Sequence, residues 1–179
     1  MKKLKLVIFI MLIVQLMSLD VAFAETQESL NHRPKKVLFL CTGNYYRSRF
    51  AEAFFNYLSD QKRKTKPVLW RAFSRGLKVK VERKLPVSEL ITEELNRLKI
   101  PLSYVDSRPT QFTESDLEHA DYVVALSERE HRPYFQKDFP SVDLKKIKFW
   151  DIEDIDKTPA DSALRAIQGR VTQLFEELK

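Results

Sequence analysis

Apolar runs suited to buried strands alternate with amphipathic stretches suited to helices along this chain. Val37-Leu38-Phe39-Leu40 is a continuous apolar run that ends at Cys41, as expected for a strand buried on both faces of a parallel sheet. Later segments repeat this strand character. The sequence predicts strands at residues 37–41, 68–73, 122–126 and 146–150.

Apolar residues recur at helical spacing between and after the predicted strands. The predicted helices cover residues 48–59, residues 86–98, a short stretch ending at His119, a stretch beginning at Ser127, and a C-terminal stripe at 164–178. Pro86 suits the first position of its helix. Ser127 and Glu130 have the spacing of a capping box, in which a serine hydroxyl and a glutamate carboxylate both cap the helix start.

This alternation of strands and helices predicts an α/β fold. Right-handed crossovers place helices on both faces of a parallel sheet, so we expect a three-layer sandwich with a four-stranded parallel sheet flanked by helices. Ligands bind such sheets beyond the carboxyl ends of the strands. Cys41, Ser74, Ser127 and Asp151 are expected at those ends.

The first 24 residues have the layout of a secretory signal peptide. Lys2, Lys3 and Lys5 precede an apolar run at 6–17, and Ala22-Phe23-Ala24 has the small-x-small pattern of a cleavage site. We therefore expect a signal peptide at 1–24, a flexible lead-in at 25–35 and one domain at 36–179. The protein would be exported, periplasmic or secreted. The alternative is an uncleaved segment that tethers the domain to the membrane.

Composition fits one globular domain and limits the partners. The chain has 179 residues, 44% of them hydrophobic, and a formal net charge of +6. Removing the signal peptide, with three lysines and Asp20, would leave +4. No nucleic-acid-binding motif accompanies this mild charge, so neither a nucleic acid nor, after cleavage, a membrane is an expected partner. The oligomeric state is not indicated.

Cys41 is the single cysteine of the chain. An exported protein with one cysteine has no internal disulfide, and zinc sites built from several cysteines are excluded. The thiol is either a buried small hydrophobic group or a reactive one.

The segment Cys41-Thr42-Gly43-Asn44-Tyr45-Tyr46-Arg47-Ser48 joins the first predicted strand to a helix and suits a phosphate dianion. Backbone N–H groups of a tight loop and of a helix start attract anions, and Gly43 permits the turn. Arg47 offers a planar fork for two phosphate oxygens. The same environment stabilises Cys41 as a nucleophilic thiolate. Ser48 is placed to hydrogen-bond the sulfur, and Asn44 tolerates left-handed backbone angles.

With this C-x-G-N-x-x-R-S segment, the chain resembles the low-molecular-weight protein tyrosine phosphatase family, whose loop reads C-x-G-N-x-C-R-S. The resemblance spans about residues 35–178. It includes Ser74-Arg75-Gly76, Ser107-Arg108, Ala120-Asp121 and Trp150-Asp151-Ile152-Glu153-Asp154.

The resemblance implies a phosphatase that acts through a phospho-cysteine, with Cys41 as nucleophile, Arg47 as phosphate clamp and Asp154 as general acid. Asp151 and Asp156 are the second and third candidates for the acid. The expected substrate is a phosphorylated protein or a small phosphomonoester, and no metal or organic cofactor is implied. The remaining implied residues are Thr42, Gly43, Asn44, Tyr45, Tyr46 and Ser48 at the phosphate, and Ser74 as loop support.

Several residues depart from the family pattern. Ile155 replaces the proline after the acid, and Asp156 replaces an aromatic that walls the phosphotyrosine pocket. Tyr45 is the expected remaining wall. Tyr46, at the position of the second loop cysteine, is expected to fill core space, and without that cysteine an oxidised Cys41 has no disulfide partner.

These departures keep a non-catalytic phosphate- or phosphopeptide-binding module open as an alternative. An arsenate reductase of this fold would need two further cysteines, which the chain lacks. His32, His119 and His131 have no metal-ligand spacing and are expected at the surface.

Overall fold

The computed structural model describes residues 34–63, 70–80, 86–105 and 108–178. The predicted signal peptide, the lead-in up to residue 33, the first two residues of the predicted second strand, His32 and Ser107 lie outside the described residues. The first strand already includes Lys35, which the sequence placed in the lead-in.

The sheet has four parallel strands in the order β2-β1-β3-β4, which confirms the predicted α/β class. The strands are β1 (Lys35–Cys41), β2 (Trp70–Gly76), β3 (Tyr122–Ala125) and β4 (Ile147–Phe149). β1 lies in the interior of the sheet, and its last five residues are buried. This burial on both faces explains its uninterrupted apolar run.

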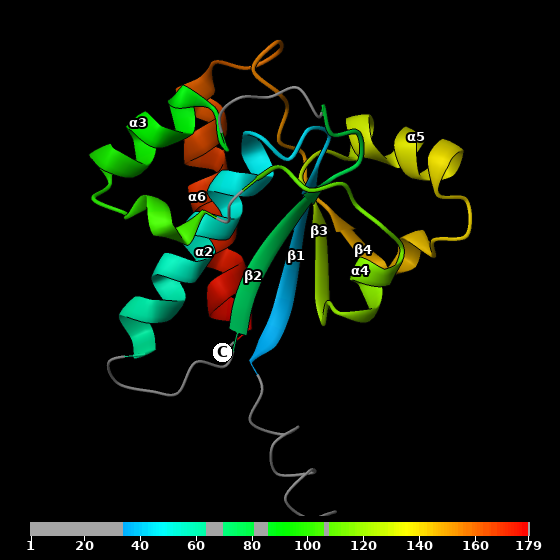
Figure 1. Cartoon of the computed structure of the whole chain (residues 1–179), viewed down its shortest axis with the longest axis horizontal. Helices are drawn as coiled ribbons and strands as arrows, with labels where there is room; N and C mark the ends of the chain where they lie inside the picture. The colour runs from blue at the N-terminus through cyan, green and yellow to red at the C-terminus, as the bar shows by residue number, and fades with distance from the viewer. Residues whose placement is uncertain (1–33, 64–69, 81–85, 106–107, 179) are drawn as a thin grey trace, which may run out of the picture. The chain divides into compact units, whose positions relative to one another are not determined.

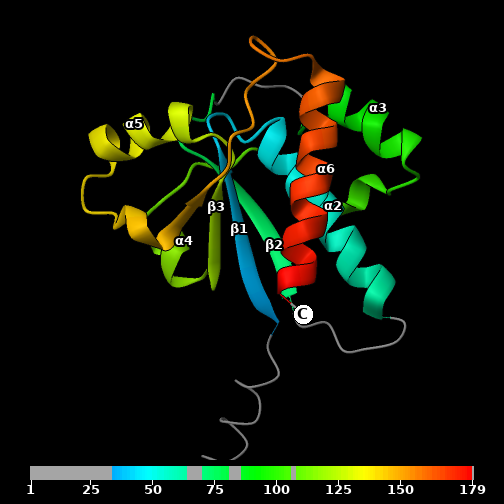
Figure 2. The same cartoon turned by 180° about the vertical axis from the view of Figure 1, so that it is seen from behind.

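Helices cover both faces of the sheet (Figure 1). α2 (Arg47–Arg63), α3 (Glu89–Arg97) and α6 (Ala160–Glu177) lie on one side. α4 (Ser115–Glu118) and α5 (Glu128–Asp138) lie on the other side, as the view from behind in Figure 2 also shows. Short 3-10 helices η1 (Leu102–Tyr104) and η2 (Leu144–Lys146) complete the described part. None of the helices in the described ranges has the length and apolar character needed to cross a membrane.

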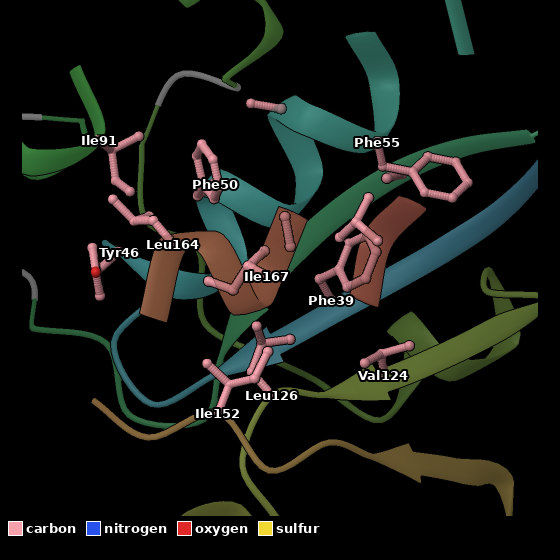
Figure 3. Packing of buried hydrophobic residues seen from close by; sticks show 14 of the residues in the cluster. Phe39, Tyr46, Phe50, Phe55, Ile91, Val124, Leu126, Ile152, Leu164 and Ile167 are labelled. Atoms are coloured by element: carbon pink, nitrogen blue, oxygen red, sulfur yellow. The ribbon is translucent and has the colours of Figure 1, made fainter. Parts of the chain in front are cut away.

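The core lies on both sides of β1, because successive side chains of a strand point to opposite faces. Val37 and Phe39 belong to the cluster under α2, α3 and α6, whereas Leu38 and Leu40 belong to the cluster under α4 and α5. Figure 3 shows the first cluster, in which the Phe39 ring lies 6.0 Å from that of Phe55.

The end of β2 and the start of α3 are two of the element boundaries that differ from the sequence prediction. β2 continues to Gly76, so Ser74 lies inside the strand and not beyond its end. Polar side chains can occupy this stretch because they have partners: Ser74 donates to Glu52, and Arg75 pairs with Asp116. α3 begins only at Glu89, with Ser88 at the N-cap, so Pro86 precedes the helix.

Candidate functional site

The loop between β1 and α2 is held in a tight conformation by Asn44. This residue has φ 46°, in the left-handed region that asparagine tolerates better than most residues. Its side chain is buried and fully bonded. The Oδ1 atom accepts from the backbone N–H of Thr110 (2.8 Å), and Nδ2 donates to the hydroxyls of Ser74 (2.7 Å) and Ser48 (3.1 Å). The loop is therefore built before any ligand arrives.

Gly76 lets the end of β2 approach the same loop. A Cβ atom at this position would lie 2.8 Å from the Asn44 nitrogen and 2.9 Å from the Thr42 oxygen. Both are backbone atoms of the loop and cannot rotate away. The backbones are joined there by a hydrogen bond from Lys78 N–H to the Thr42 carbonyl (2.7 Å).

Gly76→Ala should lower the free energy of unfolding by about 1–3 kcal/mol, the usual cost of overpacking. Urea unfolding measures this change. Gly169→Ala is a matched control, because Gly169 lies inside α6 and a Cβ there meets no atom of the described residues within 4 Å. The control should stabilise the protein by roughly 0.5–1 kcal/mol. Equal effects at the two positions would contradict the close approach at Gly76.

Cys41 lies at the end of β1 with its sulfur turned toward the start of α2. The Sγ atom is 3.0 Å from the hydroxyl oxygen of Ser48. That oxygen already accepts from Asn44 Nδ2, so the serine hydrogen is free to donate to the sulfur. The chain of bonds continues from Asn44 to Ser74, whose hydroxyl donates to Glu52 (2.6 Å). The network thus supplies a hydrogen bond that stabilises a thiolate.

Arg47, the first residue of α2, connects the loop to two acidic segments. Its side chain is 1% exposed, and Nη1 donates to the carbonyl of Ile152 (3.1 Å). Nη2 lies 2.8 Å from Asp154 Oδ2 and 2.6 Å from Glu130 Oε2. Burial opposes the charge of Arg47, but Cys41 and these carboxylates outweigh it and raise the pKa of the guanidinium. The site therefore holds a permanent cation beside the sulfur.

The segment that carries Asp154 forms a turn without proline. The Asp154 carbonyl accepts from the backbone N–H groups of Lys157 (2.9 Å) and Thr158 (3.0 Å). Ile155 also donates its N–H to Asp154 Oδ1 (2.8 Å), a bond that a proline could not make. The carboxylate is thus oriented by a backbone donor as well as by Arg47.

The three candidate acids differ in their contacts. Within the described part of the chain, Asp154 is the candidate whose carboxylate hydrogen-bonds to Arg47. Asp151 is exposed and forms a backbone bridge with Ser127. Asp156 is exposed and lines a cavity of about 400 Å³ with residues 129–130, 153–155 and 157. In the described ranges, no three His, Cys, Asp or Glu side chains gather in a way that could hold a metal ion.

The family model described as low molecular weight phosphotyrosine protein phosphatase matches residues 36–179. The chain belongs to this family. No curated protein sequence matches it significantly. Its fold is similar to the low-molecular-weight protein tyrosine phosphatase from T. tengcongensis, with a TM-score of 0.64, 28% identity, and coverage of 80% of this chain and 99% of that one.

Two further solved structures share the fold at lower identity. YfkJ from Bacillus subtilis has a TM-score of 0.69 and 24% identity, with 82% of this chain and 95% of that chain covered. The YwlE arginine phosphatase from Geobacillus stearothermophilus has a TM-score of 0.61 and 22% identity, with 81% and 93% covered. The family fold thus occurs in phosphatases with different substrates.

The two loop tyrosines of this family member have different surroundings. Tyr46 lies in the core among the side chains of Figure 3, and its hydroxyl donates to the carbonyl of Ala160 (2.9 Å). Burial, with a contribution from Asp154, raises the pKa of Tyr46 to about 12, so it stays a neutral donor. Tyr45 is partly exposed, and its carbonyl accepts from Ser88 N–H (3.1 Å). Tyr46 therefore anchors the loop to α6, and Tyr45 stays the candidate aromatic wall.

Glu130 and His131 lie at the site, although their sequence patterns predicted a helix cap and a surface position. The predicted capping box forms only in half: Ser127 Oγ accepts from Glu130 N–H (3.4 Å), but Ser127 N–H donates to His131 Nδ1 (3.1 Å). The Glu130 carboxylate instead accepts from Thr42 Oγ1 and pairs with Arg47. The position of these two residues in the chain could have indicated a place at the site. They lie in the first turn of α5, which follows the carboxyl end of β3 and so faces the site.

His131 was expected at the surface, and that prediction is wrong. Its side chain is completely buried at the start of α5. Burial and the nearby charge of Arg47 lower the pKa of His131 to about 3. The imidazole is therefore neutral in the folded protein near neutral pH.

This buried histidine predicts a loss of stability in acid. In the unfolded chain a histidine takes up its proton near pH 6.5. Protonation of the unfolded state will therefore lower the free energy of unfolding as the pH falls from about 6.5 toward 3, by up to ~1.4 kcal/mol per pH unit. Urea unfolding at pH 7 and pH 5 measures this slope. His131→Asn should reduce this slope by the contribution of about one proton. Equal slopes in wild type and His131→Asn would contradict the burial of a neutral imidazole.

Proposed function

We propose that the protein is a cysteine-dependent phosphomonoesterase of the protein tyrosine phosphatase type, acting through a phospho-cysteine intermediate. The observation that carries this proposal is that Arg47 links the loop that begins at Cys41 to the distant segment that carries Asp154. Cys41 and Arg47 belong to one loop, and Asp154 reaches the same guanidinium at 2.8 Å from a segment 107 residues away. These contacts support the roles proposed for Cys41 as nucleophile, Arg47 as anion clamp and Asp154 as acid.

In the proposed first step, the Cys41 thiolate attacks phosphorus, an S–P bond forms and the P–O bond to the leaving group breaks. Arg47 and the loop N–H groups hold the equatorial oxygens, and protonated Asp154 gives its proton to the leaving oxygen. In the second step, Asp154 takes a proton from water, which attacks phosphorus and releases phosphate. The departing thiolate accepts the hydrogen bond of Ser48, whose oxygen lies 3.0 Å away.

The test is hydrolysis of para-nitrophenyl phosphate in metal-free buffer with reductant. Samples quenched in acid during turnover should carry a phosphoryl group on Cys41, which peptide mass spectrometry detects. Turnover without any trapped phospho-cysteine, in wild type or in Ser48→Ala, would argue against the covalent route.

The lining of the cavity beside the site bears on the natural substrate. This cavity lacks the aromatic residue that Asp156 replaces. Four carboxylates and two cations lie in its lining. This excess of negative charge favours substrates with positive charge near the phosphate. Peptides with phosphotyrosine or phosphoarginine, each with basic or acidic flanks, form a suitable substrate panel.

The alternative is a non-catalytic module that binds phosphate or phosphopeptides. The observation in its favour is that Asp154 is held by Arg47 and by the Ile155 N–H, on a turn that lacks the family proline. Such a module would bind inorganic phosphate and leave every ester of the panel intact.

We also propose that the protein is exported. The charged start, apolar run and Ala22-Phe23-Ala24 of the sequence support this proposal. Mass spectrometry of protein purified from the producing cells tests it, since cleavage gives an N-terminus at Glu25. A chain that keeps residues 1–24 and sediments with membranes would favour the tethered alternative.

A further inference from the structure

Two carboxylates form ion pairs with the guanidinium of Arg47, the group proposed to bind phosphate. Glu130 Oε2 lies 2.6 Å and Asp154 Oδ2 lies 2.8 Å from the same Arg47 nitrogen. Glu130 also accepts from Thr42, so it connects the two ends of the phosphate loop. Arg47 and Cys41 are only 1% and 3% exposed beneath these groups. A phosphate that binds this nitrogen therefore has to displace at least one of the two carboxylates.

A second hydrogen bond holds Asp154 beside Arg47, whereas Glu130 has another potential hydrogen-bond partner nearby. Asp154 is fixed by the Ile155 N–H. His131 lies next to Glu130, and its Nδ1 accepts from Ser127 N–H, so the ring hydrogen of the neutral imidazole is on Nε2. Among the described residues, this buried Nε2 has no hydrogen-bond partner, and it lies 3.7 Å from Glu130 Oε2. A small rotation of the glutamate would bring the two within bonding distance.

Electrostatics favours this rotation when phosphate arrives. A phosphate dianion bound to Arg47 adds two negative charges beside the two carboxylates. Like charges so close together repel strongly where little water screens them. Movement of Glu130 away from Arg47 relieves this repulsion. It also brings an acceptor to the buried N–H of His131.

We propose that Glu130 is a positioning residue that competes with phosphate for Arg47. When phosphate binds, the Glu130 carboxylate moves away from Arg47 and accepts a hydrogen bond from His131 Nε2–H. The proposal rests on the proposed function only in taking phosphate as the ligand. The glutamate keeps Arg47 oriented when phosphate is not bound. It also lowers the apparent phosphate affinity, because only the fraction of molecules in which Arg47 is free of Glu130 can bind.

The experiment measures binding of inorganic phosphate to the full chain by isothermal titration calorimetry. Glu130→Gln, which removes the competing charge at a partly exposed side chain, should lower the dissociation constant about tenfold. Glu153→Gln is the matched control: it removes a charge from the same cavity, but its carboxylate pairs with Arg129 (2.6 Å). The control should change the constant less than twofold.

Two substitutions at His131 separate its role as a donor from its role in packing. His131→Asn keeps an oxygen near the position of Nδ1 for Ser127 N–H but removes Nε2, so phosphate should bind several-fold more weakly. His131→Gln keeps an N–H near the position of Nε2 and should restore binding. In the Glu130→Gln background, His131→Asn should not change phosphate binding further, because residue 130 then has no carboxylate to accept a hydrogen bond from His131.

The proposal is overturned if Glu130→Gln binds phosphate no more tightly than wild type. It is also overturned if His131→Asn weakens binding equally in both backgrounds, since that result indicates packing alone. Should His131→Asn fail to fold, the comparison of Glu130→Gln with Glu153→Gln still decides the competition. Binding and turnover report separately: tighter binding by Glu130→Gln without any hydrolysis would refute only the proposed phosphatase function. Hydrolysis with unchanged phosphate binding would refute only the competition.

Discussion

Cys41→Ser should reduce hydrolysis of para-nitrophenyl phosphate by at least about 10⁴-fold, the scale seen when a catalytic nucleophile is removed. The hydroxyl is a far weaker nucleophile than a thiolate, and no second cysteine of the chain can replace it. Phosphate binding should change only a few-fold, because Arg47 and the loop N–H groups are retained. Steady-state kinetics and calorimetric titration with phosphate measure the two effects separately.

Ser48→Ala is the informative companion to this variant. The Ser48 hydroxyl lies 3.0 Å from Cys41 Sγ, and in the proposed mechanism it stabilises the thiolate that leaves in the second step. Its loss should slow breakdown of the phospho-cysteine more than its formation, so the intermediate should accumulate. Cys41→Ser protein that still hydrolyses the ester at a measurable fraction of the wild-type rate would exclude Cys41 as the nucleophile.

The fold was predictable because its strongest signals are local. The run at 37–40 is apolar on both faces of its strand, and that pattern alone indicates an interior position in a parallel sheet. The Cys41–Ser48 segment likewise carries its chemistry within eight consecutive residues. Such features need no knowledge of what other parts of the chain contribute.

The roles of Glu130 and His131 were not predictable because they depend on contacts distant in sequence. Spacing alone permits the Glu130 carboxylate to cap α5, and it does not reveal that Thr42, 88 residues away, offers another partner. Pairing of β1 with β3 brings the loop and the start of α5 together. His131 Nδ1 then accepts from the cap N–H, which frees the glutamate for the site.

The same dependence on distant contacts applies to the acid segment. From the sequence, replacement of proline by Ile155 removes a stiffening residue before Asp156. In the structure, the Ile155 N–H donates to Asp154 and the turn is closed by Lys157 and Thr158. The backbone thus provides the orientation that a proline ring would otherwise impose.

Asp154→Asn should lower turnover of phenyl phosphate by about 10²–10⁴-fold, the usual contribution of a general acid or base. The amide keeps the size of the side chain and a hydrogen-bonding oxygen for Arg47, so the guanidinium should keep its orientation. The loss should be smaller for para-nitrophenyl phosphate, because its leaving group needs less help from a proton. Steady-state kinetics with both esters measure this difference.

Asp151→Asn and Asp156→Asn are the matched controls, since both carboxylates are exposed and removal of either also changes the charge by one. Each should retain turnover within a few-fold of wild type for both esters. A loss at Asp151 that depends on the leaving group, with Asp154→Asn unaffected, would move the acid to Asp151. Because Asp151 forms a backbone bridge with Ser127, that result would require the end of β4 to rearrange on substrate binding. An equal loss for the two esters in Asp154→Asn would instead mean that Asp154 orients Arg47 and transfers no proton.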